Sequence, residues 1–230
     1  MTMSRIELKF KISHKQAENL TLLVKSMLQT DSYCIEGTPY EVTSLYYDSS
    51  NFDMARQSIE GQEQKQKLRI RYYNDDSNKC FAEVKKKNGL KSEKSRVPIL
   101  KDFKTLFQNN DLPNLESDFN YYYHLYSANP SAIVRYSRMA YNCPYNSQVR
   151  LTFDRNIRGR LVNSSSRKSI SEEIKLRPLS MYERSILLEI KIGRNIPNWI
   201  AHIINQLNSY KVTFSKYSLS LQSLHPHMTA

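Results

Sequence analysis

The sequence of 230 residues contains few cysteines, few glycines and no long apolar stretch. Its three cysteines, Cys34, Cys80 and Cys143, are far apart and form no C-x-x-C pair, which argues against a disulfide framework or a cysteine-based zinc site. No run approaches the ~18 consecutive apolar residues of a membrane-spanning helix, and residues 1–11 lack the apolar core of a signal peptide. We therefore expect a soluble protein of the reducing cytoplasm.

Acidic residues are also in short supply. The chain has 34 lysines and arginines against 22 aspartates and glutamates, a formal net charge of +12. This excess favours polyanionic partners such as nucleic acid, anionic membrane or phosphorylated small molecules, although a generically basic surface would give the same total. Length and composition suit one ordinary folded domain, which we place at residues 1–230. The positions of the basic residues must decide between these interpretations.

Strict alternation of residue types predicts a first strand at residues 5–12, with one apolar and one charged face. Comparable strand-like runs follow at 43–48, 67–73, 80–87, 93–99, 132–140, 148–154 and 185–192. Helices are expected after the Ser13–Gln16 capping box, at 101–110, at 116–126 and from Pro197. The Ser- and Arg-rich residues 155–184 predict a mobile excursion between two strands. Many strands with few helices indicate a mostly-β α+β fold, built as an antiparallel sheet or barrel.

The charged faces of the expected strands are unusually basic. A glutamate and a lysine lie two residues apart on three of them: Glu7 and Lys9, Glu83 and Lys85, Glu189 and Lys191. Other strands carry two cations at this spacing: Arg69 and Arg71, Lys85 and Lys87, Lys94 and Arg96. For one strand, the polar outer face of any soluble sheet is a sufficient explanation. Over six or seven strands, the excess of cations favours faces that converge inside a barrel.

Such a basic interior would need an anionic ligand, because unscreened like charges repel one another. The candidate lining cations are Lys9, Lys11, Arg69, Arg71, Lys85, Lys87, Lys94, Arg96, Arg138, Arg150, Lys191 and Lys216. A polyphosphate chain would relieve the repulsion, with arginine forks and lysine point charges on its oxygens. The neighbouring glutamates would then be hard oxygen ligands for Mg²⁺ or Mn²⁺ that bridges the phosphates.

Several sequence blocks, in a fixed order along the chain, resemble those of a known protein family. They are Glu7-Leu8-Lys9-Phe10-Lys11, Ser44-Leu45-Tyr46-Tyr47-Asp48, Lys67-Leu68-Arg69-Ile70-Arg71-Tyr72-Tyr73, Glu83-Val84-Lys85, Arg138-Met139-Ala140-Tyr141, Arg150-Leu151-Thr152-Phe153-Asp154-Arg155-Asn156, Leu188-Glu189-Ile190-Lys191 and Phe214-Ser215-Lys216-Tyr217. With these blocks the chain resembles, nearly end to end, the VTC domain, a polyphosphate polymerase branch of the CYTH-like triphosphate tunnel metalloenzymes. The resemblance implies a closed antiparallel eight-stranded β-barrel with flanking helices.

The resemblance also assigns roles to single residues. It implies catalytic phosphate contacts from Lys9, Arg69, Arg71, Lys85, Lys94, Arg138, Arg150 and Lys216. Further substrate contacts would come from Lys11, Lys87, Tyr136, Lys191 and Ser215. Glu189 would hold the divalent metal, Mn²⁺ or Mg²⁺. Glu7 and Glu83 are weaker metal candidates, because a carboxylate beside a lysine can serve merely to hold that lysine in place.

The activity implied is an ATP-dependent phosphotransferase that passes the γ-phosphoryl group of ATP to a growing polyphosphate chain. Such a transfer depends on in-line positioning and charge neutralisation, and an ionised terminal phosphate needs no strong general base. A triphosphate hydrolase of the same fold, in which Glu7 or Glu83 would orient water, is the first alternative. A non-catalytic polyphosphate sensor is the second.

Partners follow from the same resemblance. ATP and inorganic polyphosphate or pyrophosphate are the expected ligands, and no nucleic-acid motif is present. Eukaryotic family members carry membrane helices and an inositol-phosphate-sensing domain, whereas this sequence resembles a stand-alone, bacterial-type version. A separate membrane protein would then handle the product and recruit the chain to the inner face of the membrane.

Overall fold

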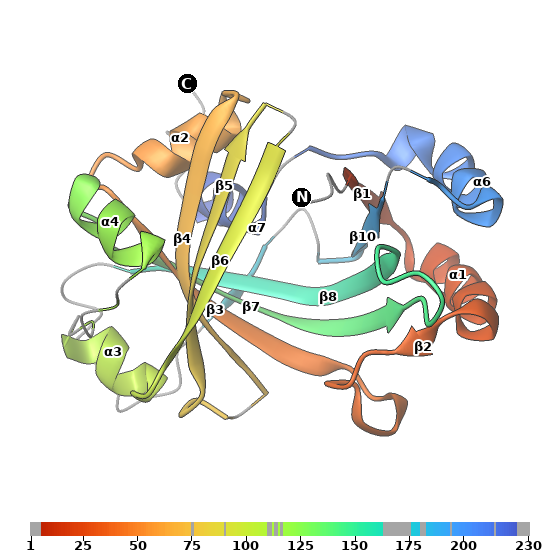
Figure 1. Ribbon diagram of the computed structural model, residues 1–230, viewed down its shortest axis with the longest axis horizontal. Coiled ribbons are helices and arrows are strands. Elements are labelled where there is room, and N and C mark those ends of the chain that lie inside the picture. Colours follow the sequence, from red (N-terminus) through yellow and green to blue (C-terminus); the bar gives the residue numbers. More distant parts are fainter. Residues whose placement is uncertain are drawn as a thin grey trace. The chain divides into compact units, whose positions relative to one another are not determined.

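The computed structural model describes residues 6–74, 76–89, 91–109, 112, 115, 117–162, 176–179, 183–193, 195–213 and 215–224. The alternating segments form strands in one ten-stranded sheet (Figure 1). The strands are β1 (Ile6–Ile12), β2 (Gln29–Thr30), β3 (Tyr40–Asp48), β4 (Gln64–Tyr73), β5 (Cys80–Asn88), β6 (Lys91–Ile99), β7 (Asn129–Asn142), β8 (Arg150–Leu161), β9 (Arg177–Pro178) and β10 (Ile186–Ile192). The mostly-β α+β class predicted from the sequence is therefore confirmed.

The sheet is an open path through its strands. Its order is β1-β10-β8-β7-β3-β4-β5-β6, with β2 added to β7 and β9 to β8. The pairs β1–β10, β10–β8, β3–β4, β4–β5 and β5–β6 are antiparallel. In the described chain this path does not close on itself, so the predicted closed barrel is wrong in that respect. The outer edge of β1 binds residues 211–212 instead, where Val212 N donates to Lys9 O at 2.9 Å.

The chain divides into two compact units, and each is described by itself below. Unit 1 contains Met1–Tyr40, Tyr136–Ile157 and Ser180–Thr213. Unit 2 contains Glu41–Arg135, Arg158–Leu179 and Phe214–Ala230. That the whole chain behaves as one domain stays a prediction.

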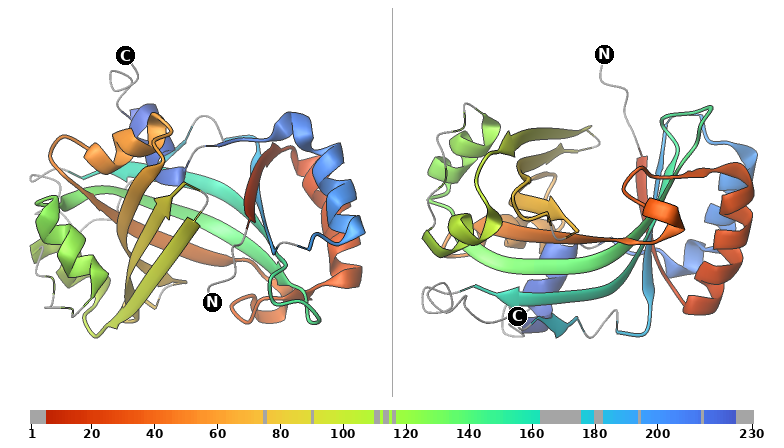
Figure 2. Two further views of the ribbon diagram at one scale, coloured as in Figure 1. Left: turned by 45° about the horizontal axis from the view of Figure 1, so that its top comes forward. Right: turned by 90° about the horizontal axis from the view of Figure 1, so that it is seen from below.

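Unit 1 buries the apolar sides of β1, β8 and β10 under two helices, α1 (His14–Met27) and α6 (Asn198–Gln206), which lie beside β1 and β10 (Figure 2). The predicted capping box starts α1, since Ser13 Oγ accepts from Gln16 N at 3.2 Å and Gln16 Oε1 accepts from Ser13 N at 2.8 Å. Phe10, Leu151 and Leu188 are fully buried in this core. The charged residues between these apolar positions are thereby turned to the other face of the sheet.

Unit 2 buries the apolar sides of β4, β5 and β6 against helices (Figure 1). Among the described residues, its helices are α2 (Asp53–Ile59), α3 (Phe103–Asn109), α4 (Asp118–Leu125) and α7 (Lys216–Leu224). Short 3-10 turns at Ile35–Gly37 and Asn208–Tyr210 belong to unit 1. The helices predicted at 101–110 and 116–126 are thus confirmed as α3 and α4. Leu68, Ile70 and Val84 are buried in this core, so the alternate residues Arg69 and Arg71 lie on the opposite face.

The excursion predicted at 155–184 is shorter than expected. β8 continues through Leu161, because Ile157 and Gly159 are buried at alternate positions and keep the segment in the sheet. Residues 177–178 return as β9. Residues 163–175 and 180–182 lie outside the described residues. Among the helices that the structure describes, none has the length and apolarity to cross a membrane.

Candidate anion-binding site

On the face of β4, β5 and β6 opposite the core, side chains align in rows across the three strands. One row joins Arg69, Glu83 and Arg96, and the row on one side of it joins Arg71, Phe81 and Pro98. The rows on the other side join Lys67, Lys85 and Lys94, and then Lys65, Lys87 and Ser92. The three strands therefore place eight cations and one carboxylate on a single face.

The one carboxylate, Glu83, lies at the centre of four of these cations. Lys94 Nζ is 2.7 Å from its Oε1, and Arg69 Nε is 2.8 Å from its Oε2. Arg96 Nε and Arg71 Nη1 follow at 3.6 and 3.9 Å. Burial alone would raise the pKa of Glu83, but Arg69, Arg71 and Lys94 hold it well below the usual range. Glu83 is 1% exposed and stays ionised, so it orders the cluster without neutralising it.

This geometry favours the second role considered for Glu83, that of holding cations in place. A metal ligand must present its oxygens to the ion, whereas both oxygens of Glu83 already face arginine or lysine nitrogens. A divalent cation beside Glu83 would also be repelled by the four positively charged side chains around it.

Tyrosines from β3 and α7 support the same cluster. Arg69 Nη1 donates to Tyr46 Oη at 3.3 Å, and the ring of Tyr46 stacks on Tyr217 with centroids 4.7 Å apart. Burial would raise the pKa of Tyr46, but Arg69 and Arg71 lower it below its ordinary value. Tyr217 Oη in turn donates to Asp48 at 2.7 Å. The phenol of Tyr46 therefore lies among cations, at a position fixed by two packed elements.

Lys216 and Ser215 come from the start of a helix. Lys216 is the first residue of α7 and is 8% exposed, and Ser215 Oγ accepts from Ser218 N at 3.0 Å, as an N-cap does. The sequence analysis placed Lys216 with the charged strand faces, and in this detail it was wrong. The ammonium group of Lys216 also lowers the pKa of Tyr46, so it belongs to the same electrostatic cluster.

In unit 1, the predicted arginines are matched by carboxylates. Arg138 Nε and Nη2 donate to the two oxygens of Asp154 at 2.6 and 2.7 Å, and Asp154 is fully buried. Glu189 Oε2 is 3.6 Å from Arg138 Nη2, and the ring of Tyr136 lies 5.1 Å from the guanidinium. Burial alone would lower the pKa of Arg138, but Asp154 raises it well above its ordinary value.

Arg150 is held in the same manner. It pairs with Asp31 and donates to Asn142 Oδ1 at 3.0 Å and to Tyr40 Oη at 3.4 Å. Asp31 is 7% exposed, and although burial would raise its pKa, the amide of Tyr33 and the charge of Arg150 lower it. The two predicted site arginines of this unit, Arg138 and Arg150, are therefore fixed by buried carboxylates before any ligand binds.

The remaining predicted residues of unit 1 lie along β1 and β10. Lys9 pairs in register with Glu189, and Glu7 with Lys191. Glu7 Oε1 is 3.4 Å from Lys9 Nζ, and its Oε2 is 3.8 Å from Lys191 Nζ. Lys11 follows on the same face of β1, by the alternation of the strand.

Glu189 is the carboxylate that best fits a divalent metal. Its side chain is about one-tenth exposed, and Thr152 Oγ1, opposite it on β8, is buried without a hydrogen-bond partner in the described chain. Within the described residues, no three His, Cys, Asp or Glu side chains gather in a way that could hold a metal. Mg²⁺ commonly uses one or two carboxylates together with substrate phosphates and water, so Glu189 would need phosphate oxygens as co-ligands.

Sequence reasoning overlooked several residues of these clusters. Lys65 and Lys67 extend the alternation of Arg69 and Arg71 by four residues, and this signal was present in the sequence. Asp31 had no such signal, because it lies in a short turn and meets Arg150 only through the fold. Of the predicted residues, unit 2 contains Arg69, Arg71, Glu83, Lys85, Lys87, Lys94, Ser215 and Lys216, and unit 1 contains Glu7, Lys9, Lys11, Tyr136, Arg138, Arg150, Glu189 and Lys191.

Two solved structures share the fold. The PH1819 protein from Pyrococcus horikoshii OT3 aligns with a TM-score of 0.51 and 13% identity, covering 95% of this chain and 98% of that one. A putative adenylate cyclase from Vibrio parahaemolyticus aligns with a TM-score of 0.50 and 10% identity, over the same shares of the two chains. At these identities the likeness concerns the fold alone, which is a mostly-β α+β fold.

The particular family follows from the sequence match. The chain belongs to the VTC domain family, whose model matches residues 4–225. It is 24% identical over 229 aligned residues to the vacuolar transporter chaperone complex subunit 4 of Schizosaccharomyces pombe. The alignment covers 80% of this chain and 32% of that protein, so the chain spans about a third of its relative's length. The family expected from the sequence blocks is thereby confirmed.

Proposed function

We propose that this protein is a polyphosphate polymerase, which transfers the γ-phosphoryl group of ATP to the end of a growing polyphosphate chain. The observation that carries the proposal is the face of β4, β5 and β6, on which these strands place eight cations and one ionised carboxylate, Glu83, with four of the cations around that carboxylate. A linear polyphosphate supplies about one negative charge for each phosphoryl unit, and successive rows of cations would meet such a long anion at several points along its length.

The chemistry asked of the protein is modest. Phosphoryl transfer needs the reacting groups in line and the charge of the transition state neutralised, with little covalent participation by side chains. The arginines of the Glu83 cluster have fixed orientations, since Arg69 binds both Glu83 and Tyr46 while Arg71 Nε donates to Ser44 Oγ at 3.0 Å. Such preorganised donors lower the cost of reorganisation during the reaction.

A divalent metal, Mn²⁺ or Mg²⁺, completes the proposal. When bound, it would supply positive charge that neutralises the phosphates, and Glu189 would be the residue that holds it. Arg138, at 3.6 Å, keeps the carboxylate of Glu189 oriented. Glu7, between Lys9 and Lys191, has the weaker case as a ligand, because two lysines already compete for its oxygens.

Hydrolysis of a triphosphate remains the principal alternative function. It would require a carboxylate able to orient or deprotonate water. Glu83 is poorly suited to that task, because the surrounding cations depress its pKa and so make it a weak base. A third function, polyphosphate sensing without turnover, would use the same cations.

One experiment separates the three functions. The purified full chain is incubated with ATP and Mn²⁺, products are resolved on a polyphosphate gel, and free phosphate is assayed in parallel. The proposal predicts a ladder of long chains with little free phosphate. Free phosphate without a ladder would contradict polymerisation and favour hydrolysis. Neither product, together with a rise in melting temperature on addition of tripolyphosphate, would favour sensing.

We also propose a cytoplasmic protein with a separate membrane partner. The support is the name of the relative from Schizosaccharomyces pombe, which describes a subunit of a complex. Fractionation of cells that express the chain tests this: recovery in the membrane fraction, released by salt, is expected. Recovery only in the cytosolic fraction would contradict recruitment and leave the proposed activity unaffected.

A further inference from the structure

The cationic face of unit 2 is chemically different at its two ends. At one end, Tyr73 and Phe81 lie next to the arginines, with ring centroids 6.2 Å apart and rings inclined at 60°. The Cζ atom of Arg96 lies 3.6 Å from the centroid of Phe81 and 5.4 Å from that of Tyr73. Arg96 thus lies over Phe81 as a stacked guanidinium, and about one-third of its side chain is exposed to solvent.

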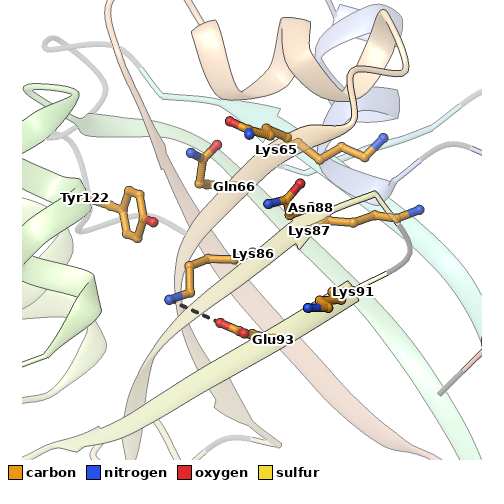
Figure 3. A pocket seen from close by; sticks show the side chains of 9 residues that line it. Lys65, Gln66, Lys86, Lys87, Asn88, Lys91, Glu93 and Tyr122 are labelled. Atoms are coloured by element: carbon orange, nitrogen blue, oxygen red, sulfur yellow. Dashed lines mark ion pairs between the residues drawn. The ribbon is translucent and has the colours of Figure 1, made fainter. Parts of the chain in front are cut away.

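The other end of the face carries lysines. Lys65 and Lys87 point to the same side of the β4–β5 strands, while Lys86 points to the other side, where it is 3.5 Å from Glu93 (Figure 3). The hollow of about 380 Å³ near this end is lined by Gln66, Lys86, Glu93 and Tyr122 among others (Figure 3), so it belongs largely to the opposite side of the strands and is no part of the cationic face. From one end of β5 to the other, the face therefore runs from aromatic rings, through arginines, to lysines.

The spacing of these zones suits a nucleoside triphosphate. The row of Phe81 lies two residues from the row of Arg69, Glu83 and Arg96, a step of about 7 Å along the strand. A ribose can bridge such a step. The next row, with Lys85 and Lys94, lies one equal step further along and would receive the distal phosphates.

We infer that the stack of Arg96 on Phe81, with Tyr73 beside it, binds the base of the nucleoside triphosphate, so that the phosphates point toward Lys85 and Lys94. The growing polyphosphate then extends toward Lys65 and Lys87. This inference rests on the proposed function and adds to it a base subsite and a direction. Nucleobases stack well on aromatic rings and on guanidinium planes, and such stacking tolerates any base with a large π face.

A purely structural role makes a different prediction. If Tyr73 and Phe81 only hold Arg96 in position, their loss should weaken binding of ATP and of inorganic tripolyphosphate to the same degree, because both ligands carry the phosphates that Arg96 would contact. If the rings bind the base, only the nucleotide should be affected. The ratio of the two affinities is therefore the informative quantity.

The experiment titrates the full chain with ATP, GTP and tripolyphosphate at constant ionic strength, for the wild type and for Tyr73→Leu and Phe81→Leu. Each leucine variant should raise the ratio of the ATP Kd to the tripolyphosphate Kd about fivefold or more. Phe81→Tyr, which keeps the ring, should leave the ratio unchanged. Tyr121→Leu is the matched control, since Tyr121 is 62% exposed on α4.

The wild type gives a second test that needs no variant. GTP should bind within a few-fold of ATP, because stacking does not distinguish the two purines. If the ratio of the ATP Kd to the tripolyphosphate Kd is unchanged in both leucine variants, the base subsite is overturned. Binding of all three ligands without chain formation would contradict the polymerase proposal and leave the subsite intact.

Discussion

The two units differ in how the arginines of their candidate sites are paired with carboxylates. In unit 1, Arg138 and Arg150 each face a buried carboxylate, Asp154 and Asp31 respectively. In unit 2, four cations share the single carboxylate Glu83. The first arrangement is close to neutral and rigid without a ligand, whereas the second keeps an excess of positive charge.

This difference indicates that the paired arginines of unit 1 stabilise the fold, whereas the arginines around Glu83 in unit 2 bind the ligand. A buried arginine–carboxylate pair is costly to break, because removal of one partner leaves the other charge in a medium of low dielectric. A cluster of like charges is relieved when one of them is removed. The same arginine-to-alanine change should therefore have opposite effects on stability in the two units, although both sets of arginines look alike in the sequence.

The largest effect is expected for Arg69→Ala. Loss of this arginine should reduce polymer formation by about 10²–10³-fold, by analogy with removal of a preorganised donor to a charged transition state. The melting temperature should stay the same or rise, because Glu83 keeps Arg71, Lys94 and Arg96. Gel analysis of the product and thermal unfolding measure the two quantities. Unfolding of this variant would contradict the assignment of Arg69 to the ligand-binding face.

Arg138→Ala tests the other side of the comparison. It leaves the fully buried Asp154 without its bidentate partner, and we expect a loss of about 3–5 kcal/mol in the free energy of unfolding. Urea denaturation gives the value. The double variant with Asp154→Asn should recover a large part of the loss. A single variant as stable as Arg69→Ala would abolish the distinction between the two units.

Glu189→Gln tests whether Glu189 is a ligand of the divalent metal. The amide keeps the size of the side chain and removes the charge that a hard cation requires, so the Mn²⁺ concentration for half-maximal activity should rise about tenfold or more. Glu83→Gln is the comparison variant, and its metal titration should not move, since Glu83 faces cations. Unchanged metal dependence of the Glu189 variant would remove it from the ligand set.

The smallest effect concerns pH. Burial lowers the pKa of Lys94 to about 8, with Arg69 and Arg71 acting in the same direction while Glu83 opposes them. Below that pH Lys94 is charged and attracts phosphate; above it, the charge is lost. Between pH 7 and pH 9 the affinity for tripolyphosphate should therefore fall a few-fold relative to that of Lys94→Arg, because the terminal phosphates of the ligand titrate alike with both proteins. Lys94→Arg should flatten this dependence, and an equal slope in both proteins would exclude Lys94 as its source.

Much of this molecule follows from period-two alternation. The same pattern that buries Leu68 and Ile70 assigns Arg69 and Arg71 to the other face, so the cationic face of unit 2 could be predicted from the sequence. The blocks that resemble the VTC domain gave the order of the strands along the chain. Lys65 and Lys67 follow the same alternation, and Lys67 even opens a family block, yet neither was counted among the lining cations.

Other features depend on pairings between distant segments. Nothing near Asp31 in the sequence indicates a partnership with Arg150, and nothing near Lys216 indicates that the helix it begins lies beside Tyr46. Closure of the barrel was likewise inferred from the family, whereas the open path depends on what occupies the outer edge of β1. Local sequence patterns predict faces of strands, but not which carboxylate from elsewhere will meet a given arginine.

The central claim is that the cationic face of unit 2 binds linear phosphate anions, and thermal unfolding tests it most directly. Thermal unfolding of the full chain is followed with tripolyphosphate, and with sulfate at the same ionic strength as the control. A ligand that binds only the native state should raise the melting temperature by about 5 °C or more at ~100 times its Kd. We predict that shift with tripolyphosphate and a much smaller one with sulfate. No shift at millimolar tripolyphosphate would contradict the account.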